Sequence, residues 1–254
     1  MAAFLAIDTS TSACSVALNI DGVITEDFVV APQDHTQRLL PMIESLLQTS
    51  NLSLHELDAI AFASGPGSFT GLRICLGVVQ GLAYGADLPV VGVSTLEIMA
   101  ATALRTMDSI LLSCEKGKRD SKGSAIVVIP ALDARMSEIY WAAFQDPSAE
   151  QEGIKHCAFN RLIEDKVSSP LGMSAPPKIE DNAFVIGVGN GWDVKGANQQ
   201  IADHIEPNVL PHAYDLAILA EKYFIDGKTS SAFDAQPTYI RNEVSWAKRK
   251  RIRS

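Results

Sequence analysis

Two strands joined by a polar turn are predicted by residues 5–19, which run Leu5-Ala-Ile-Asp-Thr-Ser-Thr-Ser-Ala-Cys-Ser-Val-Ala-Leu-Asn19. Asp8 closes the first strand, and Val16 and Leu18 in the second strand alternate with small or polar residues, as in a half-buried strand. Asp21-Gly22 follows as a hairpin signal that leads into a third strand. Three antiparallel strands in a row are therefore expected at the N-terminus.

The same pattern starts again in the second half of the chain. Residues 125–144 run Ala125-Ile-Val-Val-Ile-Pro-Ala-Leu-Asp-Ala-Arg-Met-Ser-Glu-Ile-Tyr-Trp-Ala-Ala-Phe144, again a strand, an aspartate, a polar turn and a strand. Asp133 stands where Asp8 stood, so the chain contains a weak internal repeat of topology. Two linked domains of this kind, at 1–107 and 108–254, indicate an α/β actin-like ATPase fold (ribonuclease H-like) with mixed sheets.

Helical spacing of apolar residues places the helices of this fold. In the first domain, helices are expected over about 34–47 and 69–85, and the capping box Ser94-x-x-Glu97 predicts a third helix that ends near Met107. A polar loop is expected over 114–124. One arrangement for the last helix, near 213–224, is that it packs back on the first domain.

The net charge of −9 is unevenly distributed along the chain. Residues 1–115 contain twelve acidic residues, no lysine and only three basic residues, Arg38, Arg73 and Arg105, which accounts for the whole −9. This half alone is therefore a poor nucleic-acid surface but suits a basic protein partner. The basic tail 247–254 could touch phosphate or be a solvated, disordered end. No apolar run is expected to reach the length of a membrane span. The widely spaced cysteines, with no secretion signal expected, predict a cytoplasmic protein.

Residues 64–85 combine a Gly65-Pro66-Gly67 turn with a helix that carries Gly77, Gly81 and Gly85. Steps of four keep these three glycines near one face of the helix, where each one destabilises the helix by roughly 1 kcal/mol relative to alanine. Such a row indicates close approach of another backbone. Two interpretations follow: an internal sheet or helix packs on this face, which is the commoner case, or another chain docks there.

No catalytic or metal-binding constellation is predicted. The turns after Asp8 (Thr9, Ser10 and Thr11) and after Asp133 both lack the glycines that bring backbone N–H groups to a phosphate, which argues against a working ATP site. The hydroxyls of the first turn could bind a ligand or simply cap the turn. His35 has no second ligand one helical turn away, so a capping or packing role is favoured over metal binding.

Six stretches, in order along the chain, carry a resemblance to a known family. The most specific is Gly65-Pro-Gly-Ser-Phe-Thr-Gly-Leu-Arg-Ile74. The others are Leu5-Ala-Ile-Asp-Thr-Ser-Thr11, His35-Thr-Gln-Arg-Leu-Leu-Pro-Met-Ile43, Val90-Val-Gly-Val-Ser-Thr-Leu96, Leu132-Asp-Ala-Arg-Met-Ser-Glu-Ile-Tyr140 and Tyr239-Ile-Arg-Asn-Glu-Val-Ser-Trp246. Together these stretches resemble the TsaB (YeaZ) family of tRNA threonylcarbamoyladenosine synthesis. Two features depart from the family pattern: Cys75, where the family often has glycine, and the 114–124 loop.

The resemblance implies a non-catalytic scaffold subunit that supports the catalytic subunit TsaD, with the ATPase TsaE, in threonylcarbamoyl transfer to the adenosine next to the anticodon of ANN-decoding tRNAs. It implies no tightly bound cofactor, ATP or ADP only at an interface with partners, tRNA contact only through the complex, and no membrane association. A homodimer is an option for the isolated chain. The implied interface residues are His35, Arg38, Leu39, Met42, Ile43, Leu46, Phe69, Leu72, Arg73, Leu76, Gly77, Gln80, Gly81 and Tyr84.

Two other functions compete with this one. A stand-alone actin-like ATPase or small-molecule kinase would turn over ATP through Asp8 and Asp133, which would then be nucleotide-facing rather than vestigial. A metalloprotease-like hydrolase would need a metal motif, and the five histidines contain no i, i+4 pair.

Overall fold

Two five-stranded sheets form the framework of the computed structural model, which describes residues 2–106, 125–146, 159–176 and 183–241. The first sheet has the strand order β3-β2-β1-β4-β5. Its strands are β1 (Ala3–Asp8), β2 (Ala13–Ile20), β3 (Val23–Val30), β4 (Ala59–Gly65) and β5 (Val90–Ser94). The first three strands are antiparallel, while β4 and β5 continue parallel to β1. The predicted run of three antiparallel strands is confirmed.

The second sheet repeats the first strand by strand. It has the order β8-β7-β6-β9-β10, with β6 in the place of β1 and the same parallel and antiparallel pairings. Its strands are β6 (Ile126–Arg135), β7 (Glu138–Asp146), β8 (Asn160–Ser168), β9 (Phe184–Val188) and β10 (His204–Glu206). Asp133 lies near the end of β6 as Asp8 ends β1, so the internal repeat of topology is confirmed.

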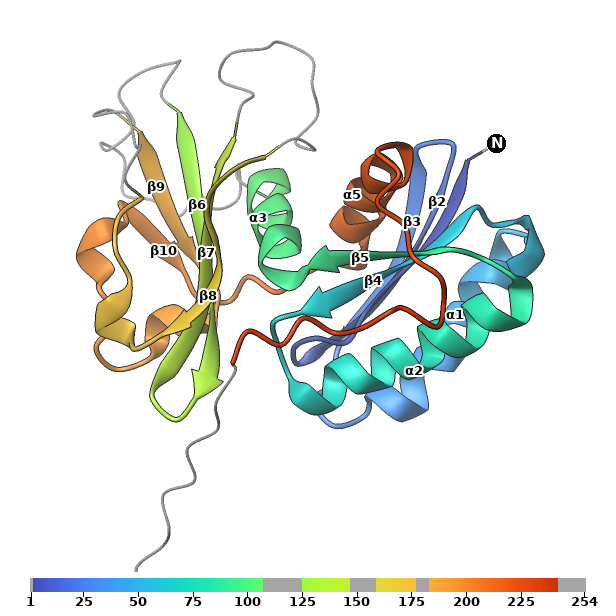
Figure 1. Cartoon of the computed structure of the whole chain (residues 1–254), viewed down its shortest axis with the longest axis horizontal. Coiled ribbons are helices and arrows are strands. Elements are labelled where there is room, and N and C mark those ends of the chain that lie inside the picture. Colours follow the sequence, from blue (N-terminus) through green and yellow to red (C-terminus); the bar gives the residue numbers. More distant parts are fainter. Residues whose placement is uncertain (1, 107–124, 147–158, 177–182, 242–254) are drawn as a thin grey trace, which may run out of the picture.

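The helices of the described residues are distributed unequally between the two halves. Helices α1 (His35–Thr49) and α2 (Phe69–Ala86) cover the outer face of the first sheet, as Figure 1 shows. The described connections between β8, β9 and β10 contain only 3-10 helices, namely η3 (Pro170–Gly172), η4 (Asn190–Asp193) and η5 (Gln199–Ile201); η1 (Leu54–Glu56) precedes β4. Among the described residues, only the first half therefore presents long helices on its outer face.

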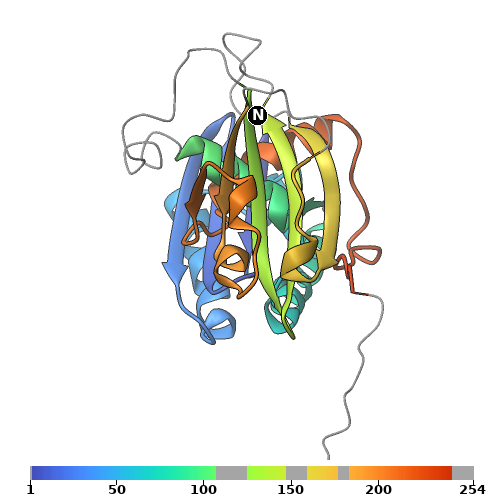
Figure 2. The ribbon, with the colours of Figure 1, turned by 90° about the vertical axis from the view of Figure 1, so that its left-hand side faces the viewer.

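Helices α3 (Thr95–Arg105) and α5 (Ala213–Ile225) lie between the two sheets (Figure 1). Each crosses to the sheet of the other half. Leu96 and Met99 of α3 pack into the core of the second sheet, whereas Leu216 and Leu219 of α5 pack into the core of the first. Figure 2, seen from the side of the second sheet, shows that sheet in front of the first. Because this exchange buries apolar surface of both halves, the two halves are interlocked.

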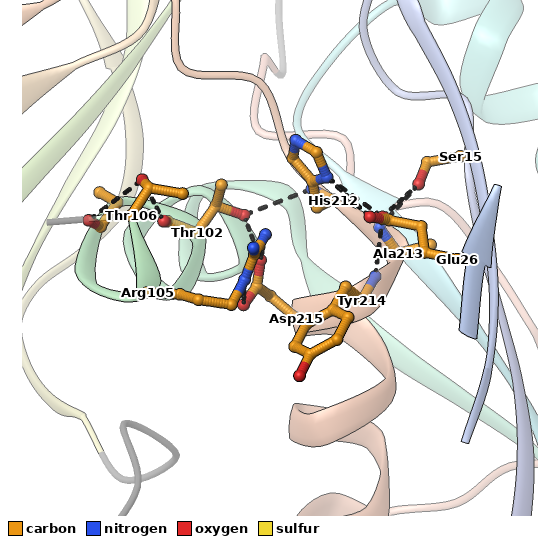
Figure 3. A network of polar contacts seen from close by, with 10 residues as sticks. Ser15, Glu26, Thr102, Arg105, Thr106, His212, Ala213, Tyr214 and Asp215 are labelled. Carbon is orange, nitrogen blue, oxygen red and sulfur yellow. Dashed lines mark hydrogen bonds and ion pairs between the residues drawn. The ribbon is translucent and has the colours of Figure 1, made fainter. Parts of the chain in front are cut away.

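A polar network fastens the start of α5 to β2, β3 and α3 of the first half (Figure 3). Glu26 on β3 accepts hydrogen bonds from the Ser15 hydroxyl at 2.8 Å and the Tyr214 N–H at 3.0 Å, and it lies 3.0 Å from Nδ1 of His212. Burial alone would raise the pKa of Glu26, but the hydrogen bonds from His212, Tyr214 and Ser15 together hold it below its usual value. The carboxylate is therefore an anchor for the start of the helix.

Asp215, in the first turn of α5, holds the other side of this network. Its buried carboxylate accepts two hydrogen bonds from Arg105 at 2.8 Å and one from the Thr102 hydroxyl at 2.7 Å.

Asp215→Ala should lower the free energy of unfolding by about 3 kcal/mol, because Arg105 would lose its counter-ion. The Arg105 side chain is 33% exposed, which keeps the loss at the low end for a broken buried pair. Urea unfolding measures this. Asp34→Ala, which removes the exposed pair with Arg38, is the control and should change stability by less than about 1 kcal/mol.

The predicted capping box at the start of α3 is only half present. The Ser94 hydroxyl accepts from the N–H groups of Leu96 and Glu97, as expected. The Glu97 carboxylate, however, binds Arg161 at 2.7 Å and the Tyr223 hydroxyl instead of the Ser94 backbone. A charged partner from β8 has replaced the local one. The helix ends at Arg105, and the 114–124 loop and the 247–254 tail lie outside the described residues.

Candidate functional site

The first polar turn is covered by the N-terminus of α2. The Ser68 hydroxyl caps this helix by accepting from the Gly71 N–H at 3.3 Å. A Cβ on Gly67 would lie 2.4 Å from the Ser10 carbonyl oxygen, and one on Gly71 would lie 2.0 Å from the Thr9 carbonyl oxygen. The Thr9 hydroxyl also donates to the Gly71 carbonyl at 2.8 Å. These two glycines are therefore needed for backbone-to-backbone contact inside the chain.

Asp8 ends β1 directly before this turn and is only 2% exposed. Its Oδ1 accepts from the Ser10 N–H at 2.6 Å, while its Oδ2 and the Ser10 hydroxyl have no hydrogen-bond partner among the described residues. Burial raises the pKa of Asp8 to about 6, against the opposing effects of Ser10 and His212. Asp8, Thr9 and Ser10 are buried, and Thr11 is half-buried. Their nucleotide-facing role stays a prediction.

The second polar turn is more open and has an unusual backbone. Asp133 is half-buried; its Oδ1 accepts from the Arg135 N–H at 2.7 Å, and its Oδ2 lies 3.1 Å from the Arg135 guanidinium. Arg135, Met136 and Ser137 have φ angles of 65°, 56° and 60°, a left-handed backbone conformation that residues other than glycine rarely adopt. The carboxylate of Asp133 is thus occupied within its own turn. Its predicted nucleotide contact stays a prediction.

The glycine row on α2 faces away from the protein. Gly77, Gly81 and Gly85 are exposed, and a Cβ built on any of them would meet no described atom within 4 Å. The commoner interpretation, that an internal sheet or helix packs on this face, is therefore wrong for the part of the chain that the structure describes. The row is available to another chain.

Helix α2 is unusually apolar for a helix with so much exposed surface. Over its 18 residues the mean hydropathy is 1.2, yet only 28% of it is buried. The expectation that no segment reaches the length and hydropathy of a membrane span is thus corrected, by length and composition only. Leu72, Cys75, Val79 and Ala83 pack inward, so α2 is part of a globular core with a second apolar face turned outward.

The structure divides the predicted interface residues into two groups. Six of them are buried in the chain's own core, which is a correction, because a buried side chain is not on the surface that a partner meets; they are His35, Leu39, Met42, Ile43, Leu46 and Leu72. His35 contacts the Ala13 carbonyl through Nε2 at 3.1 Å, in agreement with a packing role. The residues with exposed or half-buried side chains are Arg38, Phe69, Arg73, Leu76, Gly77, Gln80, Gly81 and Tyr84.

Known proteins resemble this chain over nearly its whole length. The tRNA threonylcarbamoyladenosine biosynthesis protein TsaB of Escherichia coli is 39% identical over 245 residues, 96% of this chain and 96% of that protein. The chain belongs to the TsaB family. The TsaB protein of Haemophilus influenzae is 38% identical over 244 residues, 96% of this chain and 95% of its own length.

Structural comparison agrees with this membership of the TsaB family. The structure of YeaZ from Pseudomonas aeruginosa matches with a TM-score of 0.79 and 38% identity over 94% of this chain and 100% of that chain. A family model described as "TsaD: tRNA N6-adenosine threonylcarbamoyltransferase" matches residues 19–235. The actin-like α/β fold of two domains is confirmed, and the chain takes part in tRNA threonylcarbamoyladenosine biosynthesis.

Sequence reasoning missed the partner of Arg73 in this TsaB-family chain. Its Nε donates to the Tyr239 hydroxyl at 3.3 Å, and its guanidinium lies 3.7 Å from the centre of the Phe69 ring. The arginine is therefore engaged within the chain rather than free for another protein. Tyr239 belongs to one of the family stretches, but nothing in the sequence indicated that this stretch lies beside α2.

Cys75, the departure from the family pattern, has a local explanation. It is fully buried, and its thiol donates to the Ile7 carbonyl at 3.3 Å. Burial, and then the charge of Asp8, raise the pKa of the Cys75 thiol well above its usual value. The thiol is therefore a protonated packing group. Among the described residues, no three His, Cys, Asp or Glu side chains gather as a metal site.

Proposed function

We propose that this chain is a non-catalytic scaffold subunit of tRNA threonylcarbamoyladenosine synthesis. In this proposal it binds the catalytic subunit TsaD and, with the ATPase TsaE, supports transfer of the threonylcarbamoyl group to the adenosine next to the anticodon of ANN-decoding tRNAs. The observation that carries the proposal is the outward glycine row of α2, on a helix that is apolar and mostly unburied. Such a surface is typical of a site where another helix docks.

The state of the two polar turns supports a scaffold rather than an enzyme. Asp8 is buried, and Asp133 is bound to its own turn. We therefore expect no tightly bound cofactor, and ATP or ADP only at an interface with partners. The acidic first half favours contact with tRNA through the complex rather than directly. The isolated chain can pair with a second copy through the same face, and the proposed location is the cytoplasm, without a membrane.

A reconstitution with single omissions tests this proposal. The chain is mixed with TsaD, TsaE, ATP, threonylcarbamoyl-adenylate and tRNA, and formation of the modified nucleoside is followed by mass spectrometry. Product should fall to background when either this chain or TsaD is omitted, because each depends on the other. Full product without this chain would contradict the scaffold role, and full product without TsaD would make this chain the transferase.

A stand-alone actin-like ATPase or small-molecule kinase is the competing function. The observation that favours it is the pair of matched aspartates, Asp8 and Asp133, at equivalent strands of two equivalent sheets. It requires ATP turnover by the purified chain alone, and loss of that turnover in Asp8→Asn and Asp133→Asn. Turnover that both substitutions abolish would replace the scaffold proposal with this one.

A further inference from the structure

The C-terminal segment, residues 229–241, is fixed along one side of α2. Ser230 pairs with Val90 on the edge of the first sheet through two hydrogen bonds of 2.9 Å. Farther along, the Ala235 carbonyl accepts from the Gln80 amide at 3.1 Å, and the Thr238 N–H donates to Ser64 at 2.7 Å. Figure 1 shows this segment in red, passing beside α2 toward the second sheet. The C-terminal segment therefore contributes to the same surface as α2.

This segment places two exposed aromatic pairs beside α2. Near the C-terminal end of the helix, the rings of Tyr84 and Phe233 meet edge to face at 5.1 Å, although the two residues are 67% and 75% exposed. At the other end, Phe69 and Tyr239 lie 6.1 Å apart with the Arg73 guanidinium over the Phe69 ring. Tyr84 and Phe233, by contrast, have no cation over them among the described residues. Their ring faces are therefore open to a cation from elsewhere.

A depression of about 480 Å³ opens between the end of α2 and the C-terminal segment, next to this open pair. Its lining includes Ala83, Tyr84, Asp87, Leu88, Ser230 and Phe233. The lining is apolar on the α2 side, and a single carboxylate, Asp87, stands among it. Asp87 is exposed and forms no ion pair within the described residues. A long apolar stem with a cationic end matches this combination of groups.

The net charge of residues 1–115 indicates which kind of molecule supplies that cation. Residues 1–115 carry the whole net charge of −9, and their three cations are already used. Arg38 pairs with Asp34, Arg105 pairs with Asp215, and Arg73 stacks on Phe69. A second copy carries the same net charge of −9. A different protein with basic side chains is the complementary occupant.

We propose that the depression beside Asp87 is an anchor site for an arginine or lysine side chain of the partner protein, with Tyr84 and Phe233 as its aromatic walls. The inference rests on the proposed function, in which the partner is TsaD, and it adds the C-terminal segment to the binding surface. The stem of the side chain would lie on Ala83 and Leu88, and its charge between the two rings and Asp87. Arginine, with its planar guanidinium, fits such a site best.

Binding of TsaD from the same organism, measured by calorimetry at several salt concentrations, tests the inference with four variants. Asp87→Asn removes the charge and keeps a residue that tolerates the left-handed backbone found there. Phe233→Ser removes one wall. The controls are Asp193→Asn and Leu171→Ser, an exposed carboxylate and an 81% exposed leucine of the second half. Melting curves establish that all four variants are folded.

We expect Phe233→Ser and Asp87→Asn each to weaken binding at least tenfold, and the two controls to change it less than twofold. Asp87→Asn should also reduce the dependence of affinity on salt, which a purely structural defect would leave in place. Unchanged affinity of both test variants for TsaD overturns the inference. If the double variant Gly77→Leu with Gly81→Leu nevertheless abolishes TsaD binding, the proposed function stands and only the anchor site is excluded. If the test variants lose self-association but still bind TsaD, the occupant of the depression is a second copy of the chain. This result also overturns the inference. No binding by the unaltered chain overturns the proposed function and this inference together.

Discussion

Replacing Gly77 and Gly81 on α2 is expected to stabilise the isolated chain and to disrupt its complex. Both positions are helical, exposed and free of atoms within 4 Å of a built Cβ, so alanine there meets no steric obstacle. Because alanine favours a helix by roughly 1 kcal/mol over glycine, the double alanine variant should gain about 2 kcal/mol. For a chain of this size that raises the melting temperature by about 4–8 °C.

The same positions should respond in the opposite sense when a partner is present. If a helix of TsaD approaches the backbone of α2 over these glycines, larger side chains must push it away. Gly77→Leu with Gly81→Leu should therefore weaken binding by at least a hundredfold, and the double alanine variant by less. Calorimetry of the complex and thermal melting of the isolated chain measure the two effects. If a variant is more stable and still binds TsaD as tightly as the unaltered chain, α2 is not part of the interface.

Two other glycines provide matched controls for the stability measurement. Gly227 also has open space around it, but its φ of +72° is unfavourable for alanine, so Gly227→Ala should destabilise the chain by about 1 kcal/mol. Gly71 is helical like Gly77, but a Cβ there would lie 2.0 Å from the Thr9 carbonyl oxygen. Gly71→Ala should therefore be severely destabilising. The three glycine classes separate helix propensity from backbone strain and from steric clash.

The framework of this fold follows from local patterns in the sequence. The hairpin at Asp21-Gly22 and the repeated strand, aspartate and turn each depend on residues close together in the chain. The two sheets built from them have the same strand order. The exchange of α3 and α5 between the two sheets depends on contacts between distant residues, so the sequence left the position of the last helix open.

The details of the site depend on information that local patterns do not contain. The spacing of Gly77, Gly81 and Gly85 shows that they share a face, but an inward and an outward row look identical in sequence. Similarly, the apolar spacing of α1 identified one face without showing that Leu39 and Ile43 are in the core rather than on a surface. Glu97 satisfied a local capping pattern, but Arg161, 64 residues away, is a charged partner and binds its carboxylate.

Asp8→Asn is expected to stabilise the chain at neutral pH by up to about 3 kcal/mol. The pKa of Asp8 is raised by burial from 3.8 to about 6, so the folded chain holds a proton that the unfolded chain has released between these values. The chain therefore loses stability as the pH rises from about 4 to about 6, and each pKa unit corresponds to about 1.4 kcal/mol. Above this window the charged carboxylate, with one oxygen unpartnered, persists at a constant penalty.

Urea unfolding of both chains between pH 4 and pH 8 measures this difference. The stability of the variant should exceed that of the unaltered chain by an amount that grows from near zero at pH 4 and levels off above about pH 6. Asp8→Ala is the control: it removes the same charge but also the acceptor of the Ser10 N–H bond, so its stability should lie below that of Asp8→Asn at every pH. A constant gap between Asp8→Asn and the unaltered chain would contradict a raised pKa.

The same variant separates the two functions that compete for this chain. An actin-like ATPase needs a charged Asp8 near its nucleotide, so Asp8→Asn would lose activity while gaining stability. A scaffold that docks through α2 does not use this carboxylate, which is only 2% exposed. We therefore expect Asp8→Asn to support full nucleoside formation in the reconstituted reaction, because the docking face of α2 is turned away from Asp8.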